Sequence, residues 1–467
     1  MALTIEQRPL YTLNPVGQEV IFTVKDAAVV SGYYNVKFIA EVHIDTADIN
    51  LGTSTAIGTF KTTPNNAGVG MYDFRPILES FVSSDNNAAN GSEYKGVATS
   101  DILTHPLHII DKFSLNDNVV RYIKIRFKVE GSTTAAETVL VIEEEDSAQY
   151  TLINGYLKYS DVQNRDSAGN FGFNTGVFQM GAGASGNRFL TNAPTTQYAN
   201  INDYGTLSFM ATPVVGNEAA TTVDYFKITL VDTAGDTTFI STPDLDNTDA
   251  NGGNTTWDSD TKNQLIHFGC FPANLKNWSS VFLANTTDLD YYLIQAYNAS
   301  NSAISERIII NINCPTLKGF EPIRLTWLNQ WGVWDYYTFK MKSTKTISTK
   351  GSSYQQLEGT WNESIYQPNG FRGGKKAFRV NATEKISMNT EFVSEAEAVW
   401  FEELINSPEV YILDSFQVDP TDALLNQYVT PARLTTSNFT KKTIANDKLI
   451  QYTFEVEKSK TLRTQSV

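Results

Sequence analysis

The chain has 467 residues and a formal charge of −15 at pH 7. That length is too great for one ordinary domain, so two to four domains of about 100–200 residues each are expected. No cluster of Lys and Arg is evident, and the acidic balance argues against a nucleic-acid partner, because such partners need basic surfaces that displace counterions from phosphates.

The composition is typical of a well-packed β protein. Aromatic residues make up 12% of the chain and charged residues 19%, which argues against disorder. No apolar run approaches the ~18 residues that a membrane-spanning helix needs. The first residues also lack the basic start and apolar core of a signal peptide. We therefore expect synthesis in a cytoplasm and no membrane insertion.

Residues 1–145 predict a first β-sandwich module. The segments 34–44 and 120–129 alternate apolar and polar side chains, as strands with one wet face do. A Gly-Ser-Thr-Thr turn separates 120–129 from 138–142, which predicts a hairpin. Between these strands, residues 70–81 predict a short strand that runs into a helical turn.

A similar pattern returns later in the chain. Residues 146–200 are rich in glycine and low in periodicity, which indicates a connector or a long ordered loop. Within residues 201–315, the segment 265–275 again predicts a strand that enters a helical turn, with alternating strands before it at 224–231 and after it at 290–297. This likeness of pattern predicts two tandem β-sandwiches of the immunoglobulin or fibronectin type.

Residues 316–467 predict a C-terminal β-rich domain with one packed helix. Ser394 and Glu397 form a capping box, in which each side chain can bond the backbone N–H of the other residue, so a helix is expected over 394–406. Four apolar side chains at helical spacing predict its buried face: Ala396, Val399, Trp400 and Leu404.

Tryptophan supplies the only candidate site. Trp327 alternates with Leu325 along a predicted strand and is expected in the core. Trp331 and Trp334 fall in the loop that follows, and three roles remain open for them. The loop could fold back onto its own core, contact a partner subunit, or stack on a glycan, since tryptophan is enriched at interface hot spots.

No motif points to catalysis, a cofactor or a bound metal. The carboxylates of 143–146 occupy successive positions of a strand end, so they point to alternating sides and do not converge as a glycosidase pair must. The aspartates of 244–252 lack the glutamate that closes a calcium loop, and an ordinary polar loop is favoured. His105 and His108 have no further ligands nearby. We expect a non-enzymatic protein.

The two cysteines, Cys270 and Cys314, are too few for a disulfide framework. Both fall within the second predicted module and could lie close in space. Reduced, buried thiols are the expectation for a protein made in a reducing compartment.

Five segments carry a resemblance to a known class of proteins. Residues 4–15 and 72–82 resemble virion structural proteins of tailed bacteriophages, of the kind found in Bacteroidetes-infecting and crAss-like phages. Residues 324–329, 384–390 and 407–411 are similar to tail or baseplate-associated proteins of the same phages. The resemblance touches both ends of the chain in scattered patches and supplies no catalytic residue.

The resemblance implies a non-enzymatic structural protein of the virion, located in the tail, tail tip or baseplate. Its partners would be copies of itself in a symmetric oligomer and other virion proteins. Two alternatives remain open. One is a head-side protein that decorates the capsid or forms a head fibre, and the other is a glycan-binding adhesin or receptor-binding module.

Overall fold

A computed structural model describes most of the chain. The described residues are 2–46, 48–82, 113–116, 120–162, 164–180, 187–211, 223–242, 264–298, 300–312, 320–360, 363–413, 429–441, 450–460 and 462–463. They form two compact units, both mainly β as predicted. The first unit contains the described residues up to 312 together with Leu328–Asp335, and the second contains the described residues of 320–327 and those from Tyr336 onward.

The first unit begins with a sandwich of two sheets. One sheet has the order β1-β3-β6, and the other has the order β2-β10-β8-β4-β5, with β9 paired to β8. The strands are β1 Thr4–Gln7, β2 Leu13–Pro15, β3 Ile21–Lys25, β4 Tyr34–Asp45, β5 Gly58–Thr62, β6 Val69–Asp73, β8 Val120–Ser132, β9 Leu140–Asp146 and β10 Tyr150–Ile153. The predicted hairpin is present as β8 and β9.

A second sandwich repeats this strand order. Its sheets run β13-β15-β18-β7 and β14-β20-β19-β16-β17. The strands are β13 Gln179–Met180, β14 Thr196–Ala199, β15 Thr206–Ala211, β16 Tyr225–Asp232, β17 Thr237–Ser241, β18 Gln264–Gly269, β19 Leu289–Tyr297 and β20 Ile308–Ile312. The remaining elements of the unit are short: α1 Ala27–Gly32, α5 Ser280–Ala284, the 3-10 turns Tyr159–Asp161 and Thr175–Phe178, and the pair β11 Asn164–Arg165 with β12 Phe171–Gly172.

The two sandwiches share an immunoglobulin-type topology. In each, a short early strand lies parallel to the last strand of the larger sheet, β2 with β10 and β14 with β20. In each, the third strand of the smaller sheet leads into a helix, from β6 into α2, Arg75–Leu78, and from β18 into α4, Pro272–Trp278. In each, two short early strands join different sheets, β1 and β2 in the first sandwich and β13 and β14 in the second. The duplication predicted from the sequence pattern is therefore visible in the strand order.

One strand crosses between the sandwiches. β7, Phe113–Asn116, lies between β6 and β8 in the sequence but pairs antiparallel with β18 of the second sandwich. Strand pairing also places β10 in the first sandwich, and β13 and β14 in the second. The segment expected as a connector at 146–200 thus supplies strands to both.

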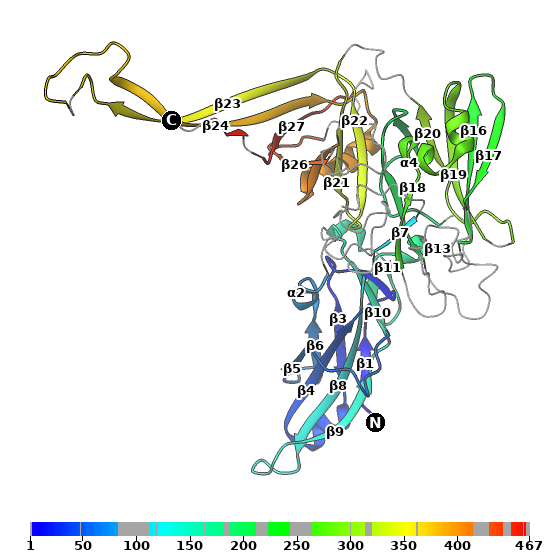
Figure 1. Cartoon of the computed structure of the whole chain (residues 1–467). Coiled ribbons are helices and arrows are strands. Elements are labelled where there is room, and N and C mark those ends of the chain that lie inside the picture. The colour runs from blue at the N-terminus through cyan, green and yellow to red at the C-terminus, as the bar shows by residue number, and fades with distance from the viewer. Residues whose placement is uncertain are drawn as a thin grey trace. The chain divides into compact units, whose positions relative to one another are not determined.

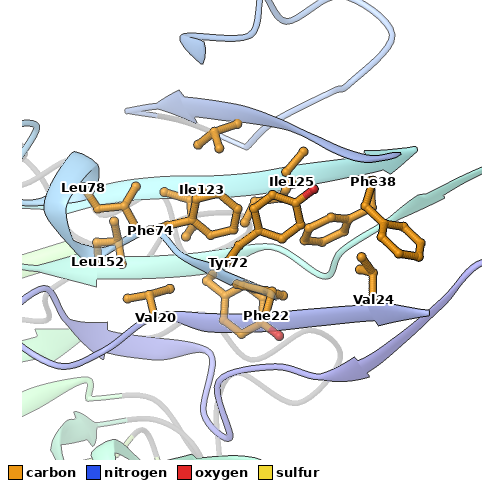
Figure 2. Close-up of a cluster of buried hydrophobic side chains, with 14 of the residues drawn as sticks. Val20, Phe22, Val24, Phe38, Tyr72, Phe74, Leu78, Ile123, Ile125 and Leu152 are labelled. Carbon is orange, nitrogen blue, oxygen red and sulfur yellow. The ribbon is translucent and has the colours of Figure 1, made fainter. Parts of the chain in front are cut away.

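Aromatic side chains fill the first sandwich. Figure 2 shows Phe22, Tyr72 and Phe74 gathered between the sheets with aliphatic side chains around them. The rings of Phe22 and Phe127 lie 5.6 Å apart, and those of Tyr72 and Phe74 stack at 5.5 Å. Phe22 lies on β3 and Phe127 on β8, the strands that a disulfide joins in antibody domains. Each buried ring contributes about 1.5–3 kcal/mol of transfer free energy.

The second unit is built on one large sheet of order β22-β21-β25-β26-β27-β24-β23, with β28 paired to β24. Its strands are β21 Ile323–Leu328, β22 Trp334–Phe339, β23 Ser343–Gln356, β24 Gly374–Asn389, β25 Val410–Leu413, β26 Val429–Leu434, β27 Thr453–Lys458 and β28 Leu462–Arg463. Trp327 is fully buried, as expected, with its ring 5.0 Å from that of Trp400.

The predicted helix is present as α6, Glu395–Asn406, and both hydrogen bonds of its capping box form. The predicted buried face is partly wrong. Trp400 and Leu404 are buried, but Ala396 and Val399 are exposed. The helix turns its Ala398 and Phe401 side inward instead, because the Phe401 ring packs at 5.5 Å from Phe454 of β27. Among the described residues, no helix is long and apolar enough to cross a membrane.

Candidate functional site: the projecting arm of the second unit

The structure buries both candidate tryptophans. Trp331 is 3% exposed and Trp334 is 4% exposed. The Trp331 ring lies 4.4 Å from that of Phe178 and 5.1 Å from that of Phe173. It belongs to a cluster that takes strand residues from both sandwiches: Leu13, Val120, Ile153, Met210 and Leu265.

Backbone and amide hydrogen bonds hold the Trp331 loop in place within the first unit. The Asn329 side chain donates to the Leu190 carbonyl at 2.8 Å, and the Tyr156 amide donates to the Gln330 carbonyl at 3.0 Å. Gly332 has a φ of +75°, and a Cβ there would lie 1.8 Å from the Asn154 carbonyl oxygen. The loop is therefore a core element, and its glycine permits the close approach.

Because Trp331 and Trp334 are buried, they cannot make the partner or glycan contacts considered from the sequence. A ring that stacks on a sugar or a partner must present a face to solvent, and neither indole does. Of the three alternatives, the structure matches the loop that folds back onto its own core.

The remaining sequence candidates have simple structural roles or fall outside the described residues. The run at 143–146 forms the end of β9, where Asp146 pairs with Arg126 at 2.8 Å. The hydrogen bond from Arg126 lowers the pKa of the Asp146 carboxyl. The loop at 244–252, both His105 and His108, and Cys314 all lie outside the part of the chain that is described.

Two buried groups of the second sandwich have pKa values shifted by desolvation. Cys270 is a free, buried thiol, and burial raises its pKa. His267 Nδ1 lies 2.7 Å from Ser208 Oγ, and full burial lowers the His267 pKa to about 4. Within the described residues, no group of three or more His, Cys, Asp or Glu side chains is arranged to hold a metal.

The most unusual feature of the structure is the long ribbon of β23 and β24, here called the arm, residues 343–389. The two strands have 14 and 16 residues and pair antiparallel from Ser343–Met388 to Gln356–Gly374, with one register shift between Ser352 and Ser353. At ~3.4 Å per residue the ribbon extends about 48 Å. Figure 1 shows it leaving the rest of its sheet as a single projection.

The inner half of the arm is anchored. β27 pairs with Lys385–Asn389 of β24, and β28 pairs with Asn381 and Ala382. Ion pairs support these ladders, with Lys385 at 3.0 Å from Glu455 and Lys345 at 2.7 Å from Glu321. Because three strands and paired charges meet here, the base of the arm has a defined direction.

The outer half is a two-stranded ribbon with exposed apolar side chains. Described pairing on β24 beyond Asn381 is with β23 alone. Leu357, Ile365 and Phe371 near the turn are 60%, 67% and 74% exposed. A two-stranded ribbon is marginally stable in water by itself, and clustered exposed apolar side chains mark surfaces that another molecule covers.

Hydrogen bonds link the described residues on the two sides of the turn at the end of the arm. The Thr360 hydroxyl donates to the Ile365 carbonyl at 2.8 Å and accepts from the Gln367 amide at 2.8 Å. Gly359 has a φ of +63°, and the Tyr366 ring lies 2.4 Å from where its Cβ would be. The turn therefore presents its apolar side chains in a fixed arrangement.

Positive charge also gathers on the outer arm, where four cations lie within residues 372–379 of the sequence and strand pairing adds Lys350. Five cations are involved: Lys350, Arg372, Lys375, Lys376 and Arg379. Among the described residues, no acidic side chain forms an ion pair with Lys350, Lys375 or Arg379. The arm thus combines the two properties of a docking element, apolar area and uncompensated charge.

A sequence signal for the arm existed in residues 343–356. They are rich in Thr, Ser and Lys and show no apolar face, which is typical of a strand wet on both sides. Such a strand cannot belong to the interior of a sandwich. Its long glycine-bearing turn and the alternating strand that follows complete a hairpin pattern.

Comparisons with known proteins add little. No protein-family model matches the sequence, and no curated protein matches it. Among solved structures, the native α2-macroglobulin of E. coli aligns at 8% identity and a TM-score of 0.18, over 82% of this chain and 21% of that one. A mutant Salmonella α2-macroglobulin aligns at 10% identity and a TM-score of 0.18, over 100% of this chain and 30% of that one. This chain therefore spans less than a third of either, and so low a likeness carries no argument.

Proposed function

We propose that this chain is a non-enzymatic structural protein of a tailed-phage virion, in the tail, tail tip or baseplate. The observation that carries the proposal is the arm, a rigidly based ribbon whose end exposes Leu357, Ile365 and Phe371. In an assembled particle a neighbouring subunit would cover this end. Tandem immunoglobulin-like sandwiches support the proposal as scaffolding elements, and the phage assignment comes from the resemblance of the sequence segments described above.

The proposal is tested on particles. Phage purified by density gradient from the source of this sequence should contain peptides of the chain at a constant ratio to the major capsid protein. Labelled antibody would then place the chain on tail or head by electron microscopy. Absence of the chain from purified particles would contradict the proposal, and label on the head would move it to the head-side alternative.

The arm itself is tested with a tip variant that carries Leu357→Ser, Ile365→Ser and Phe371→Ser. Supplied in trans to a phage that lacks the gene, this variant should fold but fail to enter particles. A matched variant with Met71→Ser, Leu140→Ser and Phe239→Ser removes three other exposed apolar side chains, each 56–67% exposed, and controls for general changes in surface hydrophobicity. Equal incorporation of the tip variant and the wild-type chain would contradict a role for the arm.

A further inference from the structure

Charge is divided unequally along the chain. The arm, residues 343–389, contains seven Lys and Arg against three Asp and Glu, a formal charge of +4. Residues 201–315, which include most strands of the second sandwich, contain four Lys and Arg against thirteen Asp and Glu, a formal charge of −9. Because the whole chain is strongly acidic, two copies repel each other on average, and a contact between them is favoured where the arm of one meets acid on the other.

One end of the second sandwich combines acid with exposed apolar area. We call it the acidic end, and it consists of Asp232, Asp236, Val281, Leu283, Asp288 and Asp290. Asp236, Asp288 and Asp290 are exposed. Among the described residues, no cation forms an ion pair with any of its four aspartates.

Hydrogen bonds bring the parts of the acidic end together. The Asp232 amide donates to the Asp236 carbonyl at 3.1 Å, which closes the turn between β16 and β17. The Thr233 amide donates to the Asp288 carbonyl at 2.9 Å, which holds the approach to β19 beside that turn. Carboxylates from two separate segments therefore share one end of the sheet.

The helix α5 adds the apolar part. Its Phe282 ring packs at 5.6 Å, edge to face, against Tyr292 of β19. That contact turns the flanking side chains outward, so Val281 is 42% exposed and Leu283 is 55% exposed. The acidic end thus offers negative charge that complements the cations of the outer arm and apolar surface that its exposed apolar side chains can cover.

We infer that the arm of one copy docks on the acidic end of a second copy of this chain. The outer cations face the aspartates, and the apolar side chains of the turn cover Val281 and Leu283. The inference rests on the proposed assembly role and names the partner and the partner surface of that same arm. The arm and the acidic end are different surfaces, so each copy can dock its own arm on one neighbour and receive the arm of another. Such a contact builds a closed ring or an open filament.

The inference is tested by reversing charge on each side of the contact in the full chain. The arm-reversed variant carries Lys375→Glu, Lys376→Glu and Arg379→Glu. The end-reversed variant carries Asp236→Lys, Asp288→Lys and Asp290→Lys. A control with Lys25→Glu, Lys37→Glu and Lys124→Glu changes net charge as much as the arm reversal but leaves the arm intact.

Self-association is measured by sedimentation velocity and light scattering across a range of protein concentrations. Each reversed variant should associate at least about tenfold more weakly than the wild type, the size expected when several exposed ion pairs become repulsive. The control should associate as the wild type does. Mixing the two reversed variants should restore association, because each arm then meets an end of opposite charge. Only a contact between copies is rescued by mixing.

Three results would overturn the inference. The first is a wild-type chain that stays monomeric at its solubility limit. The second is an end-reversed variant that associates normally. The third is a mixture of the two variants that fails to associate although each remains folded by circular dichroism. None of these results bears on whether purified particles contain the chain, so the inference can fail while the proposed function stands.

Discussion

At the scale of single residues, Gly332 is the most constrained position that the structure reveals. Gly332 and Gly169 both have a positive φ, of +75° and +84° respectively. Of these two glycines, only Gly332 lies against another backbone segment. A Cβ at Gly169 would meet nothing within 4 Å. The pair therefore separates the cost of the backbone conformation from the cost of the close approach.

We predict that Gly169→Ala lowers the free energy of unfolding by about 1–2 kcal/mol, the cost of a left-handed conformation. Gly332→Ala should cost several kcal/mol more, because the Asn154 carbonyl must move and the Trp331 cluster must open with it. Thermal unfolding of both variants measures the difference. Equal melting temperatures would show that the loop adapts without opening.

His267 provides a pH dependence. Its folded pKa of about 4 lies below the unfolded value of 6.5, because the ring is buried and its Nε2 has no partner among the described residues. The unfolded chain therefore binds this proton first as the pH falls. Stability is full above the unfolded value and is lost as the pH drops from about 6.5 toward 4.

We predict that His267 alone removes about 2 kcal/mol of stability between pH 7 and pH 5. A His267→Gln variant should lose that much less over the same range, although it is less stable at pH 7. Urea unfolding at both pH values gives the comparison, and the difference cancels other titrating groups such as His43. If the wild type and the His267→Gln variant lost equal stability between pH 7 and pH 5, His267 would accept a proton as readily in the folded state as in the unfolded state.

At the scale of elements, the arm shows how little the stability of a segment depends on its most exposed side chains. Leu357, Ile365 and Phe371 leave most of their surface in water, so the folded monomer gains little from them. Ile386, on the inner half of β24, is 2% exposed and packs within the second unit.

The tip variant with Leu357→Ser, Ile365→Ser and Phe371→Ser should therefore unfold within a few degrees of the wild type. By contrast, Ile386→Ala should cost about 2–5 kcal/mol, the usual range for a large aliphatic side chain removed from a core. Differential scanning calorimetry distinguishes the two. A large loss in the tip variant would mean that the turn packs against its own chain.

The elements also show what sequence patterns can and cannot predict. The strand β8 was predictable because apolar and polar residues alternate along it and its burial follows the same alternation. The strand β4 was predictable from a similar pattern, although Ile39 and His43 of its polar face are also buried. The role of Trp331 was not, because burial in a loop depends on distant partners such as Phe173 and Phe178. The buried side of α6 shifted for the same reason, since Phe401 found aromatic neighbours that helical spacing alone does not reveal.

At the scale of the whole molecule, the duplication is a property of strand order more than of residues. The two copies have equivalent strand orders, yet β7, which lies in the sequence of the first copy, pairs with a strand of the second. Pattern analysis predicted the repeat, because each copy has its own alternating strands and its own strand that enters a helix. The sequence pattern could not predict that β7 pairs with the second sandwich, because the sequence of a short strand does not specify which sheet it joins.

We predict that disrupting β7 destabilises the second sandwich although the mutations lie in the first module's sequence. Ser114→Pro together with Leu115→Pro removes two successive N–H groups, at least one of which faces β18, since neighbouring residues of a strand alternate in hydrogen bonding. Hydrogen exchange should speed up in β18 and β15 but not in β3 or β6. Protection unchanged in β18 would show that β7 contributes nothing to that sheet.

Because β7 pairs with a strand that is made much later, it has no partner during a long part of synthesis. β7 ends at Asn116 and its partner β18 ends at Gly269, whereas every strand of the first sandwich has been made by Ile153. A ribosome that adds about 5–20 residues per second needs roughly 8–30 s to produce the intervening ~150 residues. During that interval the first sandwich can close while β7 has no partner to pair with. The yield of correctly folded protein should therefore depend on translation speed, and a slow stretch of codons between the two strands would lengthen the period in which β7 can pair with the wrong chain.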